Sequence, residues 1–515
     1  MSETVSTEAG VLRGAGEGPV TVFRGIPFAA PPVGLLRFAP PTEVEPWDGV
    51  RAATEFGPSP MQNIDPLSMV VPGAERYYYT PSSAQFSEDC LYLNVCTPAA
   101  DGKKRPVMVW IHGSGFVTGS GSGEWFDGTN LVTKNDVVLV SINYRLGILG
   151  YLYLGDFDPS LSNPGLRDQA TALRWVRRNI ERFGGDPDNV TVFGQSAGGM
   201  AVASLMVSPL GVGLFDRAIV QSGNASSFVS KERAQSTTRA VIDALQLGPG
   251  DEVEQLREVS TLRLFEVQRT LASRFFPTMD GNSLAIDPLA EVRGGNAANV
   301  PLLIGTTAEE LKLFHLLGFP VPEDGFDLEG ALRGFFGGAP AGVAAEAAQL
   351  YRSSSPGGAG QLWDLATSDA GFVLPARDLA DAHAAAGRAS YLFEFAIKST
   401  AFGGIVGAAH EVDVPFVFDA LHKPGVDGLL GTELVSDPAA QSLAAEVGAA
   451  WTTFARTGSP ASASIGEWPR YEARDRATVI LDRVISIENN HNAERLDFMS
   501  AHAPSGALFA LLGYD

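Results

Sequence analysis

The sequence predicts an α/β fold in which helices cover both faces of a large, mostly parallel sheet. Arg105–Ile111 is almost wholly apolar, which is typical of a strand buried on both faces. Leu166–Phe183 carries apolar residues at helical spacing and is followed by Gly184 and Gly185, which predicts an amphipathic helix with a glycine end. Strands and helices alternate along the chain, and this order indicates a parallel sheet with two covered faces.

The other predicted elements fit this architecture. Short alternating runs separated by glycines predict a small N-terminal β-meander over Thr4–Phe28. The proline-rich segment Arg24–Gly34 predicts a fixed irregular path, and residues 54–88, which include Tyr77–Tyr79, predict a long surface loop. No repeat or linker divides the sequence, so we expect a single domain over residues 1–515. Further strands are predicted at Glu88–Pro98, Val137–Ile142, Val190–Phe193, Ala218–Gln221, Leu302–Ile304 and Tyr391–Phe395.

The composition excludes several classes of partner. The 515 residues include 37 basic and 59 acidic side chains, which give a net charge of −22. Such an acidic surface argues against nucleic acid and anionic membranes as partners. The longest apolar run, Val137–Leu149, contains Asn143 and Arg145 and is shorter than the ~18 apolar residues that a membrane helix needs.

The two cysteines and the N-terminal residues bear on the cellular compartment. Cys90 and Cys96 lie on one predicted strand, roughly 20 Å apart at about 3.3 Å per residue, which is too far for a disulfide. We expect both to be structural thiols. The first residues have neither the basic start nor the apolar stretch of a signal peptide. We therefore expect a cytoplasmic protein, and a monomer.

The clearest motif is a Gly-x-Ser-x-Gly pattern centred on Ser196. An apolar run precedes it and the helix-compatible run Met200–Met206 follows it, which is the strand–turn–helix order of a nucleophile elbow. The turn holds its serine in a strained backbone conformation, and the flanking glycines avoid Cβ clashes. Ser196 would then stand at a helix N-terminus, where the N–H group of Ala197 can help to bind an oxyanion.

A nucleophilic serine also needs oxyanion donors, a base and a carboxylate that orients the base. The predicted strand Val107–Ile111 leads directly into a His-Gly-Ser-Gly-Phe loop. The N–H groups of Ser114 and Gly115 are therefore candidate donors, although such a loop can also be an ordinary glycine-rich turn.

Sequence alone ranks the seven histidines less sharply. His410 stands between a glycine-rich loop and the apolar run Val414–Phe418, where a base at a sheet edge would lie. His112 lies in the donor loop itself and is expected to pack behind the turn. His383 lies in an alanine-rich helical pattern and is expected to be solvated. The other histidines have no comparable setting: His315, His422, His491 and His502.

The candidate acid is one of two adjacent glutamates. Glu309 and Glu310 come just beyond the predicted strand Leu302–Ile304. Catalytic groups of such folds gather at the carboxyl ends of strands. Two neighbouring glutamates are more commonly a surface pair, so these residues alone leave both interpretations open.

Taken together, the motifs resemble those of the type-B carboxylesterases, a family that includes cholinesterases and bacterial para-nitrobenzyl esterases. Both family signatures are complete, in Phe183–Gly198 and in Glu88–Pro98. The resemblance covers nearly the whole chain and implies the α/β-hydrolase fold, with neither a metal nor a cofactor. Further agreement occurs at Gly25–Pro27, Pro31–Gly34, Asn143–Gly147, Asp168-Gln169, Pro301–Glu310, His410 with Pro415–Phe418, and Trp468-Pro469.

The resemblance also implies a role for individual residues. Ser196 would be the nucleophile, His410 the base and Glu310 the acid, with Glu309 as the alternative acid. The oxyanion donors would be the N–H groups of Ser114, Gly115 and Ala197. The resemblance adds supporting residues and structural ion pairs: Ser222 and Gln195 beside the triad, and the pairs Arg37–Glu88 and Arg145–Asp168.

Three positions depart from the family pattern. Ser114 stands in the middle of a donor loop that is usually all glycine or ends in alanine, which bears on the acceptance of bulky alcohol groups. Gln195 replaces the glutamate of many members and removes a negative charge beside the base. Met61 lies where many secreted members place a cysteine that bonds to the equivalent of Cys90, so the long loop is not covalently held here.

We therefore expect a serine carboxylic-ester hydrolase that acts through an acyl-enzyme on small to medium uncharged esters. A cholinesterase is the first alternative, but residues 54–88 lack the tryptophan expected for cation–π contact. A lipase, which an oil interface would activate, is the second. A non-catalytic adhesion relative usually lacks the serine or the histidine. Aromatic residues that can line the pocket, or belong to the core, are Phe116, Trp125, Phe275, Phe276 and Phe314.

Overall fold

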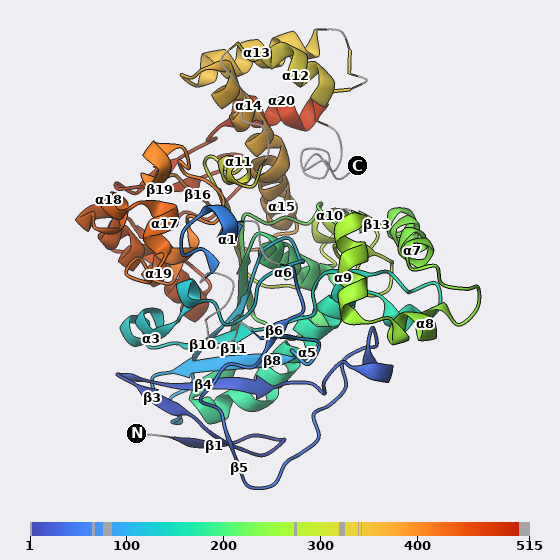
Figure 1. Ribbon diagram of the computed structural model, residues 1–515. Coiled ribbons are helices and arrows are strands. Elements are labelled where there is room, and N and C mark those ends of the chain that lie inside the picture. Colours follow the sequence, from blue (N-terminus) through green and yellow to red (C-terminus); the bar gives the residue numbers. More distant parts are fainter. Residues whose placement is uncertain are drawn as a thin grey trace.

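Figure 1 shows the fold of the computed structural model, which describes residues 3–63, 67–75, 85–271, 275–318, 325–337, 339–340 and 342–503. The predicted surface loop over residues 54–88 contains two short strands, β6 (Ser59–Pro60) and β7 (Phe86–Ser87), which pair in parallel. It also contains the short helix α1 (Leu67–Val70). Tyr77–Tyr79 lie outside the described residues.

A large twisted sheet forms the centre of the molecule. Its seven neighbouring strands from β10 to β19 run parallel, and antiparallel strands extend it at both edges. This arrangement confirms the predicted α/β fold and all six of the further predicted strands, whereas the strands Thr478–Leu481 and Ser486–Glu488 were not predicted. Within the described residues this central sheet has eleven strands, in the order β20 (Ser486–Glu488), β19 (Thr478–Leu481), β16 (Ser390–Phe395), β15 (Leu302–Thr307), β12 (Arg217–Gln221), β11 (Gly185–Gln195), β9 (Arg105–Ile111), β10 (Val138–Ile142), β8 (Tyr92–Thr97), β4 (Val20–Pro27) and β3 (Ala15–Glu17).

The predicted N-terminal meander is divided between two sheets. β1 (Thr4–Ser6) and β2 (Val11–Arg13) pair antiparallel, and β5 (Val50–Ala52) joins them in a small separate sheet. The next two strands, β3 and β4, belong to the edge of the central sheet. Gly14 lies between the two sheets, and a Cβ there would be 2.7 Å from the carbonyl oxygen of Val22, so the chain can cross between the sheets only without a side chain.

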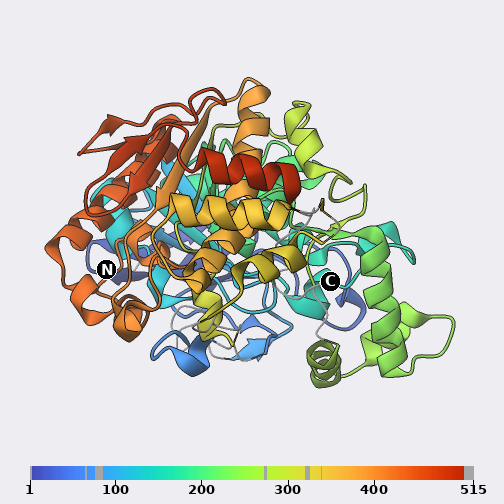
Figure 2. The ribbon, with the colours of Figure 1, turned by 90° about the horizontal axis from the view of Figure 1, so that it is seen from above.

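Alternate residues of each central strand contribute to two hydrophobic cores. Along β9, Val107 and Val109 pack on the face covered by α5 (Pro164–Asn179), α6 (Ala197–Val207) and α15 (Leu374–Ala385). Met108 and Trp110 face the opposite side, which α3 (Thr129–Asn135), α16 (Val414–Val417) and α19 (Pro438–Thr457) cover. Figure 1 labels α3 and α19 on one side of the sheet and α5, α6 and α15 on the other, and Figure 2 shows the same ribbon from above. The predicted helix Leu166–Phe183 is α5 continued by a 3₁₀ turn, and it ends at Gly184 with φ +83°.

One prediction about α15 is wrong. His383 is fully buried instead of solvated, and its Nδ1 lies 2.8 Å from the hydroxyl of Ser390. The alanine-rich pattern marks the close packing of α15 on the sheet and not an exposed helix. Burial lowers the pKa of His383 to about 4.

A helical lobe stands beyond the sheet at the top of Figure 1. It consists of α12 (Leu328–Phe335), α13 (Val343–Ser354), α14 (Ala359–Ser368) and α20 (Ala493–His502), which share a hydrophobic core of their own. α14 continues through a π-helical turn, η7 (Asp369–Val373), into α15. The buried carboxylate of Asp369 accepts hydrogen bonds from Arg495 (2.9 Å) and Tyr351 (2.8 Å), and these bonds join α20 and α13 to this turn.

Both structural ion pairs implied by the resemblance are present. Nε and Nη2 of Arg37 lie 2.8 and 2.5 Å from the carboxylate of Glu88. Arg145 donates its backbone N–H, Nε and Nη2 to Asp168 at 2.7–3.0 Å, and both side chains are almost fully buried. In the described residues, every helix is too short or too polar to span a membrane.

We predict that Asp168→Asn lowers the free energy of unfolding by about 3–5 kcal/mol, because Arg145 would stay buried without its counter-charge. Urea denaturation with linear extrapolation measures this change. The matched control is Glu266→Gln, which removes an exposed pair with Arg263 and should cost less than about 1 kcal/mol. Equal losses in the two variants would contradict the prediction.

Candidate active site

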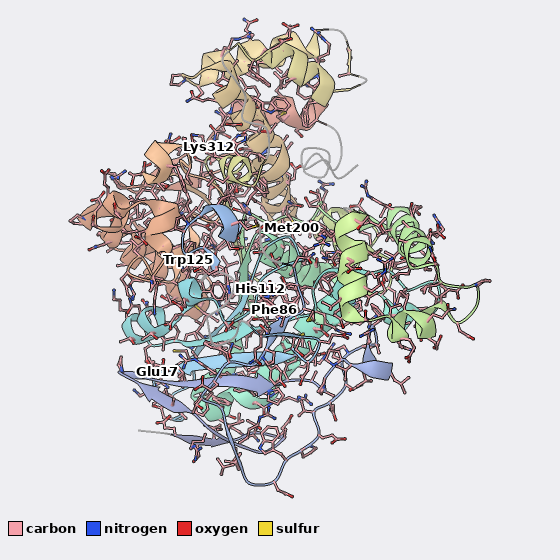
Figure 3. The ribbon with its side chains drawn as sticks, in the orientation of Figure 1. Glu17, Phe86, His112, Trp125, Met200 and Lys312 are labelled. Atoms are coloured by element: carbon pink, nitrogen blue, oxygen red, sulfur yellow. The ribbon has the colours of Figure 1, made fainter. Side chains whose placement is uncertain are left out.

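The predicted strand–turn–helix order at Ser196 is present between β11 and α6. Ser196 has φ +57° and ψ −125°, a conformation that a non-glycine residue rarely adopts. Its backbone N–H donates to the carbonyl oxygen of Gln221 (2.8 Å), which fixes the turn to the neighbouring strand β12. Gly198 has no room for a side chain, since a Cβ there would lie 2.0 Å from the carbonyl oxygen of Ile111. Figure 3 labels Met200 in the first turn of α6, near the centre of the molecule.

Glu310 and His410 meet beside this elbow, from loops that follow β15 and β16. Glu310 Oε2 lies 2.5 Å from His410 Nδ1. Its other oxygen accepts hydrogen bonds from the hydroxyl of Ser222 (2.6 Å) and the backbone N–H of Thr307 (2.8 Å). The carboxylate is therefore completely buried but fully hydrogen-bonded, and it can hold the imidazole with its Nε2 directed away from the acid.

The adjacent Glu309 points elsewhere. Its carboxylate accepts the backbone N–H of Ala408 and the ammonium groups of Lys312 and Lys398. Of the two glutamates that the sequence leaves open, Glu310 is the one that contacts the histidine ring.

The environment of His410 favours a proton on the ring. Burial by itself lowers the pKa of His410, but the charge and hydrogen bond of Glu310, with the charges of Glu411 and Asp413, raise it above its ordinary value. The Nε2 atom lies 3.2 Å from the side-chain nitrogen of Gln195. An amide N–H at this place can donate to the lone pair of a neutral imidazole whose Nδ1–H faces Glu310.

The loop after β9 lies against the elbow. A Cβ on Gly113 would be 2.7 Å from the carbonyl oxygen of Gln195 and 3.1 Å from the Cβ of Ser196. The three residues that follow, Ser114, Gly115 and Phe116, all have positive φ (73°, 63° and 62°). The hydroxyl of Ser114 is buried and has no hydrogen-bond partner among the described residues. Successive residues with positive φ can leave backbone N–H groups free to bind an anion, and this loop lies beside Ser196.

His112 supports this loop from behind, as the sequence predicts. Its ring stacks on Tyr144 with centroids 4.5 Å apart, and the Tyr144 hydroxyl donates to the carbonyl oxygen of His112 (2.8 Å). Burial lowers the pKa of His112 to about 3, so the ring is neutral. Gly119 allows the close approach, because a Cβ there would lie 2.5 Å from His112 Nδ1.

The predicted aromatic residues occupy three different places. Phe116 packs edge to face against Phe276 and belongs, like Phe275, to the buried core on the α5 and α6 side of the sheet. Phe314 lies beside His410, with ring centroids 5.6 Å apart. Trp125 is buried on the opposite side of the sheet, where its Nε1 donates to the carbonyl oxygen of Pro424 (3.1 Å); Figure 3 shows its place.

Sequence reasoning missed two residues beside the histidine. Phe372, in the π-helical turn η7, has its ring centroid 5.0 Å from that of His410, on a segment with no recognisable motif. Asp413 is buried three residues after His410, where it accepts a hydrogen bond from Gln221 (2.6 Å). Burial, and secondarily the charge of Glu310, raise the pKa of Asp413 to about 6 although the bond from Gln221 lowers it. The one sequence signal that could have indicated Asp413 is its position, an acidic residue three places after the candidate base.

The chain is similar to known esterases over nearly its whole length. The chain is 38% identical to a para-nitrobenzyl esterase of Bacillus subtilis (strain 168), covering 96% of this chain and 97% of that one. It is 34% identical to a phenmedipham hydrolase of Pseudarthrobacter oxydans, covering 92% and 94%. A solved PNB esterase superposes with a TM-score of 0.84 at 37% identity, covering 98% of this chain and 100% of the other.

A solved carboxylesterase of Geobacillus stearothermophilus also has a TM-score of 0.84, at 37% identity over 96% and 99% of the two chains. The family model described as "Carboxylesterase family" matches residues 1–499. The chain therefore belongs to the carboxylesterase family and is a carboxylic-ester hydrolase with the α/β-hydrolase fold.

Proposed function

We propose that Ser196, His410 and Glu310 form the catalytic triad of this ester hydrolase. The observation that carries the proposal is the 2.5 Å contact between Glu310 and His410 Nδ1, next to a serine held at positive φ on a strand–turn–helix elbow. The N–H groups of Ser114, Gly115 and Ala197 are the proposed oxyanion donors, supported by the left-handed backbone of the donor loop and by the helix that begins at Ala197.

In this mechanism Ser196 Oγ attacks the ester carbonyl carbon while His410 Nε2 takes the hydroxyl proton. The carbonyl oxygen becomes an oxyanion that the three N–H groups stabilise. The imidazolium, stabilised by Glu310, gives its proton to the departing alcohol as the C–O bond breaks, which leaves an acyl-enzyme on Ser196. Water, deprotonated by His410, then attacks the acyl carbon, and the acid is released as Ser196 recovers its proton.

Ser196→Ala should lower kcat for para-nitrophenyl butyrate by at least about 10⁴-fold, because it removes the atom that carries the acyl group. Release of para-nitrophenol measures the rate. Ser226→Ala is the matched control, since the bonds of Ser226 among the described residues stay within its own turn, at Asn224, and the variant should keep the rate. A Ser196→Ala enzyme that folds and keeps its rate would contradict the triad.

Small to medium uncharged esters are the proposed substrates. The amide of Gln195 beside the base carries no charge, and the aromatic rings of Phe314 and Phe372 next to His410 favour apolar groups. The similarity to a para-nitrobenzyl esterase and to a phenmedipham hydrolase also supports a small-molecule substrate. A lipase-like or a cholinesterase-like preference is the alternative. Rates with acyl chains of increasing length, with and without an oil interface, distinguish a lipase from an esterase for small to medium esters.

We further propose a cytoplasmic, monomeric protein. The two cysteines support a reducing compartment, since both are free thiols and Cys90 is buried. Size-exclusion chromatography with light scattering tests the monomer directly.

The pH dependence of the reaction should follow the charges around His410. Only the neutral imidazole accepts the serine proton, so kcat/KM should fall as the pH drops through the pKa of His410, above the ordinary 6.5. Asp413, with its pKa of about 6, is largely ionised there and stabilises the imidazolium. Asp413→Asn should therefore move the acidic midpoint of the kcat/KM profile to lower pH.

Gln195→Glu should shift the acidic midpoint of the kcat/KM profile in the direction opposite to that of Asp413→Asn. It places a carboxylate in the position that contacts His410 Nε2, so it should raise the pKa of the base and move the same midpoint to higher pH. Shifts of both variants in one direction, or an unchanged midpoint in Asp413→Asn, would show that these groups do not set the protonation of His410.

Ser114→Gly should keep hydrolysis of small esters, because the proposed donor is the backbone N–H. Loss of a true donor would cost about 10²–10³-fold. Removing the buried Ser114 hydroxymethyl group should also raise the kcat/KM ratio of tert-butyl acetate to ethyl acetate by about tenfold. Measured hydrolysis of the two esters gives this ratio; an unchanged ratio would mean that Ser114 does not limit bulky alcohols.

A further inference from the structure

Glu309 is joined to the chain just before His410 by a reciprocal pair of hydrogen bonds. Its backbone N–H donates to the carbonyl oxygen of Ala408 (2.9 Å), and its side-chain Oε2 accepts the N–H of the same residue (2.9 Å). The next residues form a similar pair of contacts. The carbonyl oxygen of Glu310 accepts the backbone N–H of His410 (3.4 Å), and the carboxylate of Glu310 contacts Nδ1 of the His410 ring. Two successive glutamates thus hold two alternate residues of the loop that carries the base.

The loop is shaped for this contact at Gly407. The residue has φ +61°, and a Cβ there would lie 2.2 Å from Glu309 Oε2, so any side chain would push the carboxylate off the N–H of Ala408. On the other side of the chain, the carbonyl oxygen of Gly407 accepts the N–H of Ser399 (2.9 Å), which closes the glycine-rich loop at its base. Ala408 and Ala409 are fully buried, so the segment has no solvent partner to replace Glu309.

The outer oxygen of Glu309 has a different environment. Lys312 Nζ lies 2.8 Å and Lys398 Nζ 3.4 Å from Oε1, and these residues line a cavity of about 390 Å³, one wall of which is α14. Figure 3 labels Lys312 on α11 (Lys312–Leu316), directly after the acid loop. Burial alone would raise the pKa of Glu309, but the bonds from Lys312 and Ala408 lower it, so the carboxylate stays ionised. Ion pairs that face an open cavity contribute little by themselves.

We propose that Glu309 is a positioning residue, which fixes the backbone before His410 and thereby the place of the imidazole relative to Ser196. This inference rests on the proposed triad. Glu309 does not touch the ring, and the protonation of His410 is governed by Glu310 and the other nearby charges. The two hydrogen bonds between Glu309 and Ala408 therefore act on the chemical step through geometry, because a misplacement of about 1 Å at a reacting group can cost roughly 100-fold in rate.

The test compares Glu309→Ala with Glu309→Gln. Glu309→Ala removes the acceptor for the Ala408 N–H and should lower kcat for para-nitrophenyl butyrate by about 10- to 100-fold, with KM and the acidic pH midpoint unchanged. In Glu309→Gln the amide oxygen can still accept that N–H while the lysine pairs are lost. It should recover most of kcat, and a purely electrostatic role would predict no recovery.

Gly407→Ala disrupts the same contact between Glu309 and Ala408 from the side of the loop that carries His410. Its effect on kcat should not add to that of Glu309→Ala, because each variant alone breaks the bond to Ala408. The matched control is Glu254→Ala on α8 (Glu252–Glu258), which removes another glutamate spaced three residues from a cation, at the far side of the molecule in Figure 1, and should keep kcat.

Two results would overturn the proposal: an unchanged kcat in Glu309→Ala, or a loss accompanied by a shifted pH midpoint. A loss of kcat that disappears once the folded fraction is corrected by thermal unfolding would overturn it as well. Failure of the triad is recognised separately, since then Ser196→Ala would keep its activity whatever the Glu309 variants do.

Discussion

The site depends on how closely two backbones approach each other where β9 ends and α6 begins. The space between Gly198 and the carbonyl oxygen of Ile111, and between Gly113 and the carbonyl oxygen of Gln195, is too small for a Cβ. This approach places the loop of Ser114 and Gly115 against the nucleophile. Parallel neighbours in the sheet then bring Ser222, Glu310 and His410 to the same edge, because the carboxyl ends of β12, β15 and β16 lie side by side.

Charge around the base is arranged unevenly. Glu310, Glu411 and Asp413 all favour the imidazolium, and together they outweigh the burial that disfavours it. Two neutral amides also contact this cluster: Gln195 lies at His410 Nε2, and Gln221 connects Asp413 to Trp451 (3.1 Å). An imidazolium at His410 would thus be stabilised by the carboxylate of Glu310 at Nδ1, while Gln195, the side chain at Nε2, carries no charge.

Local motifs explain why so much of the site could be predicted from the sequence. The elbow of Ser196 and the donor loop after β9 are turns whose glycines are required by the backbone itself, and buried strands are recognisable from continuous apolar runs. His410 and Glu310 were weaker predictions, because no local rule distinguishes an orienting carboxylate from its neighbour Glu309. That distinction came from the family resemblance, and the bonds of the two glutamates explain it.

The features that the sequence did not predict have another origin, because they depend on packing between segments that are distant in the sequence. Burial of His383 follows from the docking of α15 on the sheet, and an alanine-rich helix has the same pattern whether it is docked or exposed. The helical lobe likewise unites residues 328–368 with α20 at the end of the described chain, and no periodicity shows that pairing.

The lobe nevertheless contributes to the site, through the π-helical turn that connects it to the body. A π turn inserts extra chain into a helix and changes the direction of the side chains within it. Here it directs Phe372 against His410 while Asp369, in the same turn, is held by Arg495 and Tyr351 of the lobe. One wall beside the base is thus set by an ion pair of the lobe. The part of the chain with the least sequence signal therefore determines which side chain packs against the ring of His410.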